Sequence, residues 1–246
     1  LRGAALYYDC WTDDARLTIE TVCAARTHGA TALNYAEVTG LEKDSTGRLA
    51  TALVHDRLAD RTVMVRARWI LNVTGPWLDR VRTLDDPGAP PRLRLTKGVH
   101  AVFDRSAIGH RDAIVIRSPS DKRVMFAIPW QDRTLVGTTD TFYDDDPARV
   151  EADGDDVDYI LEAANHAFPR ADVTERDIIS MYAGLRPLVA PEDEKDESDI
   201  SRDDQIFESP SGLLSLGGGK LTTHRHVAER IVDLVASRLG RTVPRC

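Results

Sequence analysis

The residues best suited to chemistry lie near the end of the chain, in the stretch Ser215-Leu216-Gly217-Gly218-Gly219-Lys220-Leu221-Thr222-Thr223. Glycines have no Cβ atom, so a flat or anionic ligand can approach the backbone of Gly218 and Gly219 closely. A helical pattern follows at once, and the first N–H groups of a helix are unpaired and carry partial positive charge. The stretch is therefore predicted to cradle a cofactor. The alternative is an ordinary glycine-rich turn between a strand and a helix.

Three side chains are candidates for chemistry: Lys220 within this stretch, and Arg186 and His100 outside it. Lys220 places a cation beside the turn, although a surface lysine would look the same. Arg186 stands between a strand end and a proline, where its planar guanidinium suits an anionic group or a substrate oxygen; a structural ion pair is the alternative. His100 follows Lys97-Gly98 in a strand-like run, and imidazole titrates near neutral pH. His100 is therefore the candidate general base, with a packed or surface histidine as the alternative.

Composition excludes several classes of protein and partner. A chain of 246 residues, 42% hydrophobic and 29% charged, can bury a core in one large domain or two interleaved ones, and is not a disordered sequence. The net charge of −8 and the lack of a basic stripe argue against a nucleic-acid partner. The three cysteines form no CxxC pair, so we expect reduced thiols and no metal site. No apolar run approaches the roughly 20 residues that span a bilayer.

The first part of the chain predicts a small mixed unit. A strand is expected to end at residues 7–9, and a helix to run from Thr12, as N-cap, to about His28. An antiparallel meander should follow, with strands at residues 31–34, 37–42, 50–55 and 62–66. The apolar run 69–73 predicts a strand buried on both faces. Thr74 and Gly75 end that strand, at the position where open α/β sheets bind ligands.

A second block begins after the proline-rich segment 86–91, which is the first candidate domain boundary. Its strand-like runs are separated by polar turns and predict an antiparallel sheet, with strands at residues 99–103, 113–116, 124–128 and 134–138. A further strand is predicted at residues 178–185. A helix is predicted over residues 155–168. The acidic segment 191–199 is expected to be a solvated loop that returns the chain to the first domain. An amphipathic helix over residues 224–239 closes the chain.

The order of the motifs is more specific than any one of them. In chain order they are Tyr8-Asp9, Asp14-Ala15-Arg16-Leu17, Asn34-Tyr35 before Val38, Asn72-Val73-Thr74-Gly75-Pro76-Trp77, Lys97-Gly98-Val99-His100, Ile128-Pro129-Trp130, Gly137-Thr138-Thr139-Asp140, Gly184-Leu185-Arg186-Pro187-Leu188, Ser201-Arg202-Asp203 and Gly218-Gly219-Lys220-Leu221-Thr222-Thr223. This set resembles the FAD-dependent glycerol-3-phosphate dehydrogenases, within the flavoenzymes shaped like D-amino-acid oxidase. The resemblance covers nearly the whole chain.

The resemblance implies a fold of the α/β class with an antiparallel sheet. An incomplete FAD-binding Rossmann-like domain is expected from residues 1–90 and 198–246, and a substrate-side antiparallel sheet domain from residues 91–197. The family's first element, a strand leading into G-x-G-x-x-G, does not occur in this sequence. The family's helical C-terminal domain does not occur either. The chain is therefore expected to be an internal fragment of a longer enzyme.

The resemblance also assigns roles to residues of this sequence. His100, Arg186 and Lys220 are the expected catalytic residues, and Arg186, Arg202 and Lys220 are expected to bind the substrate. Lys220 is expected either to attract the substrate phosphate or to stabilise reduced flavin. A local pair with Asp203 is the alternative for Arg202, and Asp140 is expected to order a turn. FAD is the expected cofactor, with the adenine touched by the backbone of Val38. The remaining cofactor contacts are expected from Thr74, Gly75, Gly218, Gly219, Leu221, Thr222 and Thr223.

The predicted reaction is oxidation of sn-glycerol 3-phosphate to dihydroxyacetone phosphate, with electrons passed to membrane quinone. Two alternatives stay open: a glycerol-3-phosphate oxidase that reduces oxygen, and a non-catalytic remnant or binding module for phosphorylated metabolites. No nucleic-acid partner is expected. The chain is expected in the cytoplasm. A homodimer and a peripheral contact with the inner face of the cytoplasmic membrane are open expectations.

Overall fold

The computed structural model describes residues 3–190, 203–242 and 244 of the chain. The strands in this part of the chain are β1 (Ala36–Lys43), β2 (Leu49–Asp56), β3 (Arg61–Arg66), β4 (Leu71–Asn72), β5 (Leu93–Asp104), β6 (Ile114–Arg117), β7 (Val124–Trp130), β8 (Arg133–Gly137), β9 (Thr141–Phe142), β10 (Ile178–Val189), β11 (Gln205–Glu208) and β12 (Leu214–Gly217). The α-helices are α1 (Asp14–Thr27), α2 (Leu78–Asp85), α3 (Arg105–Ile108), α4 (Gly154–Ala167) and α5 (His224–Arg238). Short 3-10 turns are η1 (Gly75–Trp77), η2 (Pro147–Arg149), η3 (Glu175–Asp177) and η5 (Leu221–Thr223).

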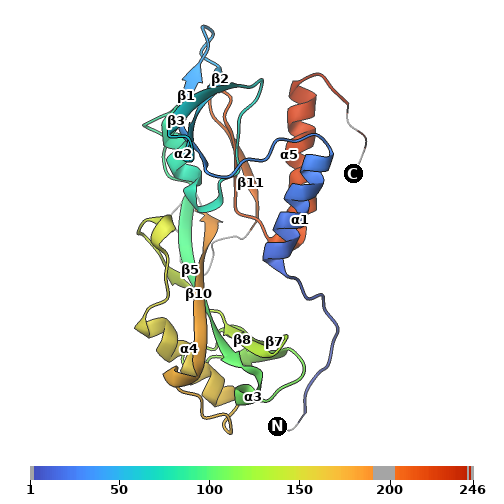
Figure 1. Cartoon of the computed structure of the whole chain (residues 1–246), viewed down its shortest axis with the longest axis vertical. Coiled ribbons are helices and arrows are strands. Elements are labelled where there is room, and N and C mark those ends of the chain that lie inside the picture. The colour runs from blue at the N-terminus through green and yellow to red at the C-terminus, as the bar shows by residue number, and fades with distance from the viewer. Residues whose placement is uncertain (1–2, 191–202, 243, 245–246) are drawn as a thin grey trace.

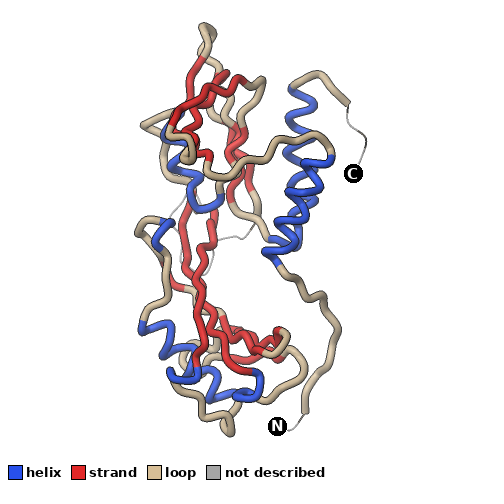
Figure 2. The backbone as a smooth tube through the Cα atoms, in the orientation of Figure 1, coloured by secondary structure: helices blue, strands red, loops and turns tan. Residues whose placement is uncertain are grey.

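The described strands form three sheets, so the predicted α/β class with antiparallel sheets is confirmed. The meander β1-β2-β3 is antiparallel throughout, as its alternating apolar residues and polar turns predict. A larger sheet has the strand order β10-β5-β8-β7-β6, with β9 also paired to β5. The third sheet has the order β11-β12-β4. Figure 2 shows β5 and β10 as the long strands that connect the upper and lower parts of the molecule.

The larger sheet buries one face and leaves the other open. Side chains alternate along a strand, so Val99, Ala101 and Phe103 of β5 all point to the same side. There they pack with Ile160 and Ala163 of α4 in a fully buried core. The intervening residues of β5 lie on the opposite face, where the Tyr182 ring beside His100 is 48% exposed. Helix α4 thus secures the sheet from behind and leaves its front free for a ligand.

A buried ion pair fastens α4 to β5. The Nζ atom of Lys97 lies 2.5 Å from Asp153 and 2.6 Å from Asp156, and Lys97 and Asp156 are both buried. Asp153 is also the N-cap of α4, and its side chain forms a capping box with Asp156. Burial acts to lower the pKa of Lys97, but its hydrogen bonds with Asp153 and Asp156 outweigh burial and raise that pKa. The hydrogen bond from Lys97 lowers the pKa of Asp153.

The first testable prediction concerns this pair. Asp156→Asn is expected to lower the free energy of unfolding by about 3 kcal/mol, because it removes one partner of a buried charge pair. The matched control is Asp153→Asn, since asparagine caps a helix as well as aspartate and position 153 is largely exposed. That control should cost at most about 1 kcal/mol. Urea unfolding of both variants measures the difference, and equal losses would contradict a special role for the buried carboxylate.

The pKa shifts also set the pH window of this contribution. The stabilisation linked to Asp153 is present above its unfolded pKa and is lost as the pH falls through the lowered folded pKa. The stabilisation linked to Lys97 is present below its unfolded pKa and is lost as the pH rises through the raised folded pKa. The pair therefore contributes fully across the neutral range.

The predicted strand over residues 69–73, buried on both faces, is wrong. Only Leu71 and Asn72 form β4, which runs parallel to β12 with Leu71 opposite Leu214. Leu71 is 37% exposed and Val73 is 57% exposed. A strand buried on both faces needs a neighbour on each edge and layers above and below. Among the described residues, β4 pairs with β12 alone.

Other expectations near the N-terminus also need correction. Residues 7–9 and 31–34 form no strand, since neither segment has a neighbouring strand to pair with in the described part of the chain. The N-cap of α1 is Asp13 rather than Thr12, and its side chain accepts from the N–H of Arg16 at 2.9 Å. No residue of α1 is buried. The helix lies beside α5 in Figure 1, and both line an apolar groove.

The remaining helix predictions are confirmed at slightly different bounds. Helix α5 buries Val227 and Ile231, as its period predicts, and α4 covers nearly the predicted range. The expected loop over residues 191–199 lies outside the described residues. None of the described helices is both long enough and apolar enough to cross a membrane.

Candidate functional site

The open face of the larger sheet carries Arg186 in a confined position. Arg186 of β10 lies opposite Thr96 of β5, and its guanidinium extends over Gly98. A Cβ atom added at Gly98 would lie 2.5 Å from Nη2 of Arg186 and 2.7 Å from Oγ1 of Thr138. The absence of a side chain at position 98 therefore makes the space that the guanidinium occupies. Arg186 keeps 27% of its side chain exposed, so an anion can still reach it.

His100 lies on the same face of the sheet and, like Arg186, is placed over a glycine. It lies opposite Gly137 of β8 and opposite Tyr182 of β10. A Cβ atom at Gly137 would lie 2.5 Å from Cδ2 of His100, so this glycine makes room for the imidazole. The Tyr182 ring stacks on the imidazole at 5.0 Å between centroids and an interplanar angle of 10°. The sheet register thus places the Arg186 guanidinium over Gly98, two residues before His100 in β5 and on the same face of the sheet.

The surroundings of His100 favour its neutral form. Burial lowers the pKa of His100 below its ordinary value, and the positive charge of Arg186 lowers it further. Asp14, at the start of α1, acts weakly in the opposite direction. A neutral imidazole at pH 7 can accept a proton, which is what a general base must do. The protonation of His100 is therefore coupled to the charge of Arg186.

Two glycine turns lie at one edge of this region. Strands β4 and β12 are parallel, so the turns that follow them, at Thr74-Gly75 and at Gly218-Gly219, leave the sheet at the same edge. Thr74 is held by its hydroxyl, which donates to Oδ1 of Asn72 at 2.7 Å. A Cβ atom at Gly218 would lie 3.2 Å from Val189, the last residue of β10. Because Arg186 is three residues earlier in β10, the second turn lies about 10 Å from it along the strand.

The second turn has a backbone that glycine adopts far more readily than other residues. Gly218 and Gly219 have φ angles of 74° and 92°, and a Cβ at Gly218 would lie 2.3 Å from the carbonyl oxygen of Asp203. The turn continues into η5, whose residues are exposed, and then into α5. The N–H of Thr223 donates within the turn to the carbonyl of Lys220 at 3.1 Å. The first N–H groups of η5, those of Leu221 and Thr222, have no acceptor within the helix.

These residues fit the group that the resemblance implies. An exposed helix start whose first N–H groups have no acceptor within the helix suits the carbonyl edge of the FAD ring system, and the positive φ angles of the two glycines let the chain turn sharply into it. Leu221 and Thr222 are therefore the residues that would hold this edge. Thr74 and Gly75 lie at the same sheet edge and would pass beside the cofactor.

Not every predicted site residue is brought to this region. Val38 lies in the meander, where it is 38% exposed opposite Val54 of β2. Lys220 is exposed at the start of η5, and no hydrogen bond or ion pair between described residues joins it to His100 or Arg186. Arg202 lies outside the described residues. The roles assigned to these three residues remain predictions.

The contacts of Asp140 go beyond the role predicted for it. Its carboxylate accepts from Arg186 at 3.1 Å and from Arg123 at 2.6 Å, contacts that its predicted place in a turn did not include. Sequence reasoning also did not single out Gly98, Gly137 or Tyr182 as site residues. The first two stand in motifs that carry the resemblance, but only the register of the strands shows that they lie beside functional side chains.

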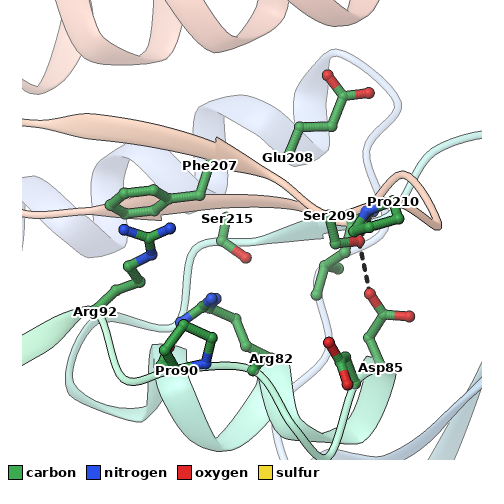
Figure 3. Close-up of a pocket in the computed structure, with 12 residues that line it drawn as sticks. Arg82, Asp85, Pro90, Arg92, Phe207, Glu208, Ser209, Pro210 and Ser215 are labelled. Carbon is green, nitrogen blue, oxygen red and sulfur yellow. Dashed lines mark hydrogen bonds between the residues drawn. The ribbon is translucent and has the colours of Figure 1, made fainter. Parts of the chain in front are cut away.

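The cavity in Figure 3 is separate from this face. It measures 180 Å³ and lies between α2 and the β11–β12 turn. Its buried carboxylate, Asp85, accepts from the hydroxyls of Ser209 and Ser211 at 2.6 Å and pairs with Lys43 at 3.3 Å. This cluster is satisfied internally and ties α2 to the β11–β12 turn. Across the described residues, no group of three or more His, Cys, Asp or Glu side chains is arranged to hold a metal ion.

The chain is similar to one family model and to two proteins that share a single name. The family model of FAD dependent oxidoreductases (DAO) matches residues 1–234. The chain is 45% identical over 239 residues to the aerobic glycerol-3-phosphate dehydrogenase of Staphylococcus haemolyticus (strain JCSC1435), covering 97% of this chain and 43% of that protein. It is 43% identical over 241 residues to the protein of the same name from Staphylococcus aureus (strain USA300), covering 98% of this chain and 43% of that protein.

A solved structure agrees with this similarity. The glycerol-3-phosphate dehydrogenase of Bacillus halodurans, complexed with FAD, superposes with a TM-score of 0.87 at 43% identity. The match covers 96% of this chain and 45% of that one. The chain therefore spans less than half the length of each of these three proteins.

Proposed function

Because the chain belongs to the FAD-dependent oxidoreductase family, we propose that it supplies the substrate face and one end of the flavin site for the oxidation of sn-glycerol 3-phosphate to dihydroxyacetone phosphate. The observation that carries the proposal is the pair of His100 and Arg186, each placed over a glycine on one open sheet face. The relatives named glycerol-3-phosphate dehydrogenase support the choice of substrate.

The residues divide the chemical tasks. His100, neutral at pH 7, takes the proton of the substrate's secondary hydroxyl. Arg186 binds an anionic group or oxygen of the substrate, and Lys220 and Arg202 add positive charge for the phosphate. FAD, when bound, supplies the acceptor for the hydride of the same carbon. The N–H groups at the start of η5 stabilise negative charge at the cofactor's carbonyl edge.

The proposed reaction can be tested by mixing the FAD-loaded enzyme that contains this chain with sn-glycerol 3-phosphate in the absence of oxygen. Rapid loss of the visible absorbance of oxidised flavin is expected. Glycerol, which lacks the phosphate, is the control and should leave the absorbance unchanged. An oxidised flavin that persists with sn-glycerol 3-phosphate would refute the proposed substrate.

We further propose that membrane quinone receives the electrons. The dehydrogenase names of the relatives support this choice, and the oxidase is the competing outcome. Turnover with a soluble quinone analogue should exceed turnover with oxygen, and little peroxide should form. Stoichiometric peroxide with slow quinone reduction would favour the oxidase instead.

The second testable prediction concerns the first N–H group of η5. Leu221→Pro removes that donor at a position where proline is tolerated, and the preceding residue, Lys220, already has the extended backbone that proline requires, with φ −124° and ψ 147°. Losing one hydrogen bond should weaken FAD binding about tenfold and lower the flavin reduction potential. The control is Leu221→Ala, which keeps the donor. Equal FAD affinity in both variants would exclude this N–H as a cofactor contact.

A further inference from the structure

Asp140 connects Arg186 to Arg123, which lies just before β7. Its Oδ1 atom accepts from Nη1 of Arg186 at 3.1 Å, and its Oδ2 atom accepts from Nη1 of Arg123 at 2.6 Å. Only 17% of the Asp140 side chain is exposed. One carboxylate, placed after β8, therefore engages an arginine of β10 with one oxygen and an arginine just before β7 with the other.

The same short segment completes the surroundings of the Arg186 guanidinium. Nη2 donates to the hydroxyl of Thr138 at 3.2 Å, and both Nη atoms lie 3.4 Å from the carbonyl oxygen of Thr139. Gly98 lies beneath the group and leaves room for it. Residues 138–140 thus hold one edge of the planar group and leave 27% of the side chain exposed.

The hydrogen-bond network that holds Arg186 extends away from the site through Arg123. Arg123 also donates from Nε to Oδ2 of Asp121 at 3.3 Å, and Asp121 accepts from the hydroxyl of Tyr159 at 2.9 Å. Tyr159 belongs to α4, the helix behind the sheet. Burial acts to raise the pKa of Asp121, but hydrogen bonds from Arg123 and Tyr159 outweigh it and lower that pKa to about 2. The contacts therefore form a continuous chain from Arg186 to the rear helix.

The geometry points to Asp140 as a positioning residue that fixes the Arg186 guanidinium and so sets the affinity for the anionic end of the substrate. This rests on the proposed function, in which Arg186 binds that anion. A free arginine side chain has about 2 kcal/mol of rotamer entropy, and holding it in place before binding removes part of that cost. The substrate then meets a guanidinium that is already oriented.

The variant Asp140→Asn distinguishes the effect of orienting the Arg186 guanidinium from the effect of the Asp140 charge, because the two change KM in opposite directions. Removing a negative charge beside Arg186 would by itself strengthen anion binding and lower KM. Losing the shared carboxylate, in contrast, frees the guanidinium and should raise KM. We expect KM for sn-glycerol 3-phosphate to rise about tenfold while kcat changes little, because the lost interaction is made in both the ground and transition states. A KM that is unchanged or lower in the holoenzyme overturns the inference.

Asp121→Asn is the matched control. It removes the same charge from the other carboxylate that contacts Arg123, but Asp121 makes no direct contact with Arg186 among the described residues. Its KM should stay within about twofold of the wild-type value. An equal rise in both variants would assign the effect to general loosening of the network and overturn the inference.

A double-mutant cycle tests whether Asp140 acts through Arg186. In an Arg186→Lys background, Asp140→Asn should raise KM by less than about twofold, because the group that it positions has been removed. A further tenfold rise in that background would show that Asp140 acts independently. The cycle therefore distinguishes positioning from a separate contribution to substrate binding.

A crystal structure of the Asp140→Asn holoenzyme tests the inference without reference to the substrate. A guanidinium displaced from Gly98 supports it, and an unmoved guanidinium overturns it. If the wild-type holoenzyme neither binds nor oxidises sn-glycerol 3-phosphate, the proposed function fails. The structure of the variant still decides whether Asp140 positions Arg186.

Discussion

Gly98→Ala is expected to leave the protein folded and to lower kcat/KM for sn-glycerol 3-phosphate by about 100-fold, since displacements near 1 Å in a reacting site have effects of this size. The added Cβ atom would lie 2.5 Å from Nη2 and 2.6 Å from Nη1 of Arg186. The guanidinium is the far end of a flexible side chain, so it moves more easily than the backbone. Steady-state kinetics and thermal unfolding of the holoenzyme separate the two effects.

Gly184→Ala is the matched control for this prediction. Gly184 lies directly opposite Gly98 in the β5–β10 pair, and a Cβ atom there would meet nothing within 4 Å. Both changes add one methyl group to the same face of the same strand pair. The control should keep kcat/KM within about twofold. A similar loss of kcat/KM in both variants would mean that a stiffer strand, and not the displacement of Arg186, causes the effect.

His100→Gln is expected to lower kcat/KM by about 100-fold to 10,000-fold, the range over which general bases contribute. Glutamine keeps a polar side chain of similar reach but cannot take up a proton at neutral pH. Burial, followed by the charge of Arg186, lowers the pKa of His100 below 6.5. The wild-type rate should therefore hold at neutral pH and fall as the pH drops through that lowered pKa, because the protonated imidazole cannot act as a base.

The pH profile gives the decisive measurement for His100. Its acid limb should disappear in His100→Gln, and an unshifted limb would remove His100 from the mechanism. His110→Gln is the control, since that ring is buried elsewhere, with Nδ1 at 2.8 Å from the carbonyl of Asp112 and Nε2 at 3.1 Å from Thr134. It should lower the thermal stability and leave the shape of the pH profile unchanged.

Elements with a clear local period were predictable from the sequence. The alternation of apolar residues identified the meander β1-β2-β3, and the 3.6-residue period identified α4 and α5 within a few residues. Helix ends were less certain, because Thr12 and Asp13 are both suitable caps and only Asp13 forms the capping hydrogen bond. Local chemistry thus identified these elements but did not choose between neighbouring caps.

Strand predictions failed where pairing with a neighbouring strand, rather than the apolar pattern of the segment, decides whether a strand forms. Residues 69–73 are apolar enough for a buried strand, yet only Leu71 and Asn72 pair, and they pair with β12. Residues 31–34 have suitable side chains but no neighbour in the described part of the chain. A strand's backbone N–H and C=O groups are satisfied by another segment, which its own sequence does not specify.

Residue types and their order were enough to predict the chemistry available to this protein: an imidazole at position 100, a guanidinium at position 186 and a glycine-rich entry to the last helix, in an order shared with one family. The tertiary structure alone decided that Gly98 and Gly137 make room for those two side chains, and that Asp140 is shared by Arg186 and Arg123. These contacts depend on which residues of distant strands lie opposite one another. Register is set by the packing of the whole sheet against α4, because a shift of one residue would turn every side chain to the other face.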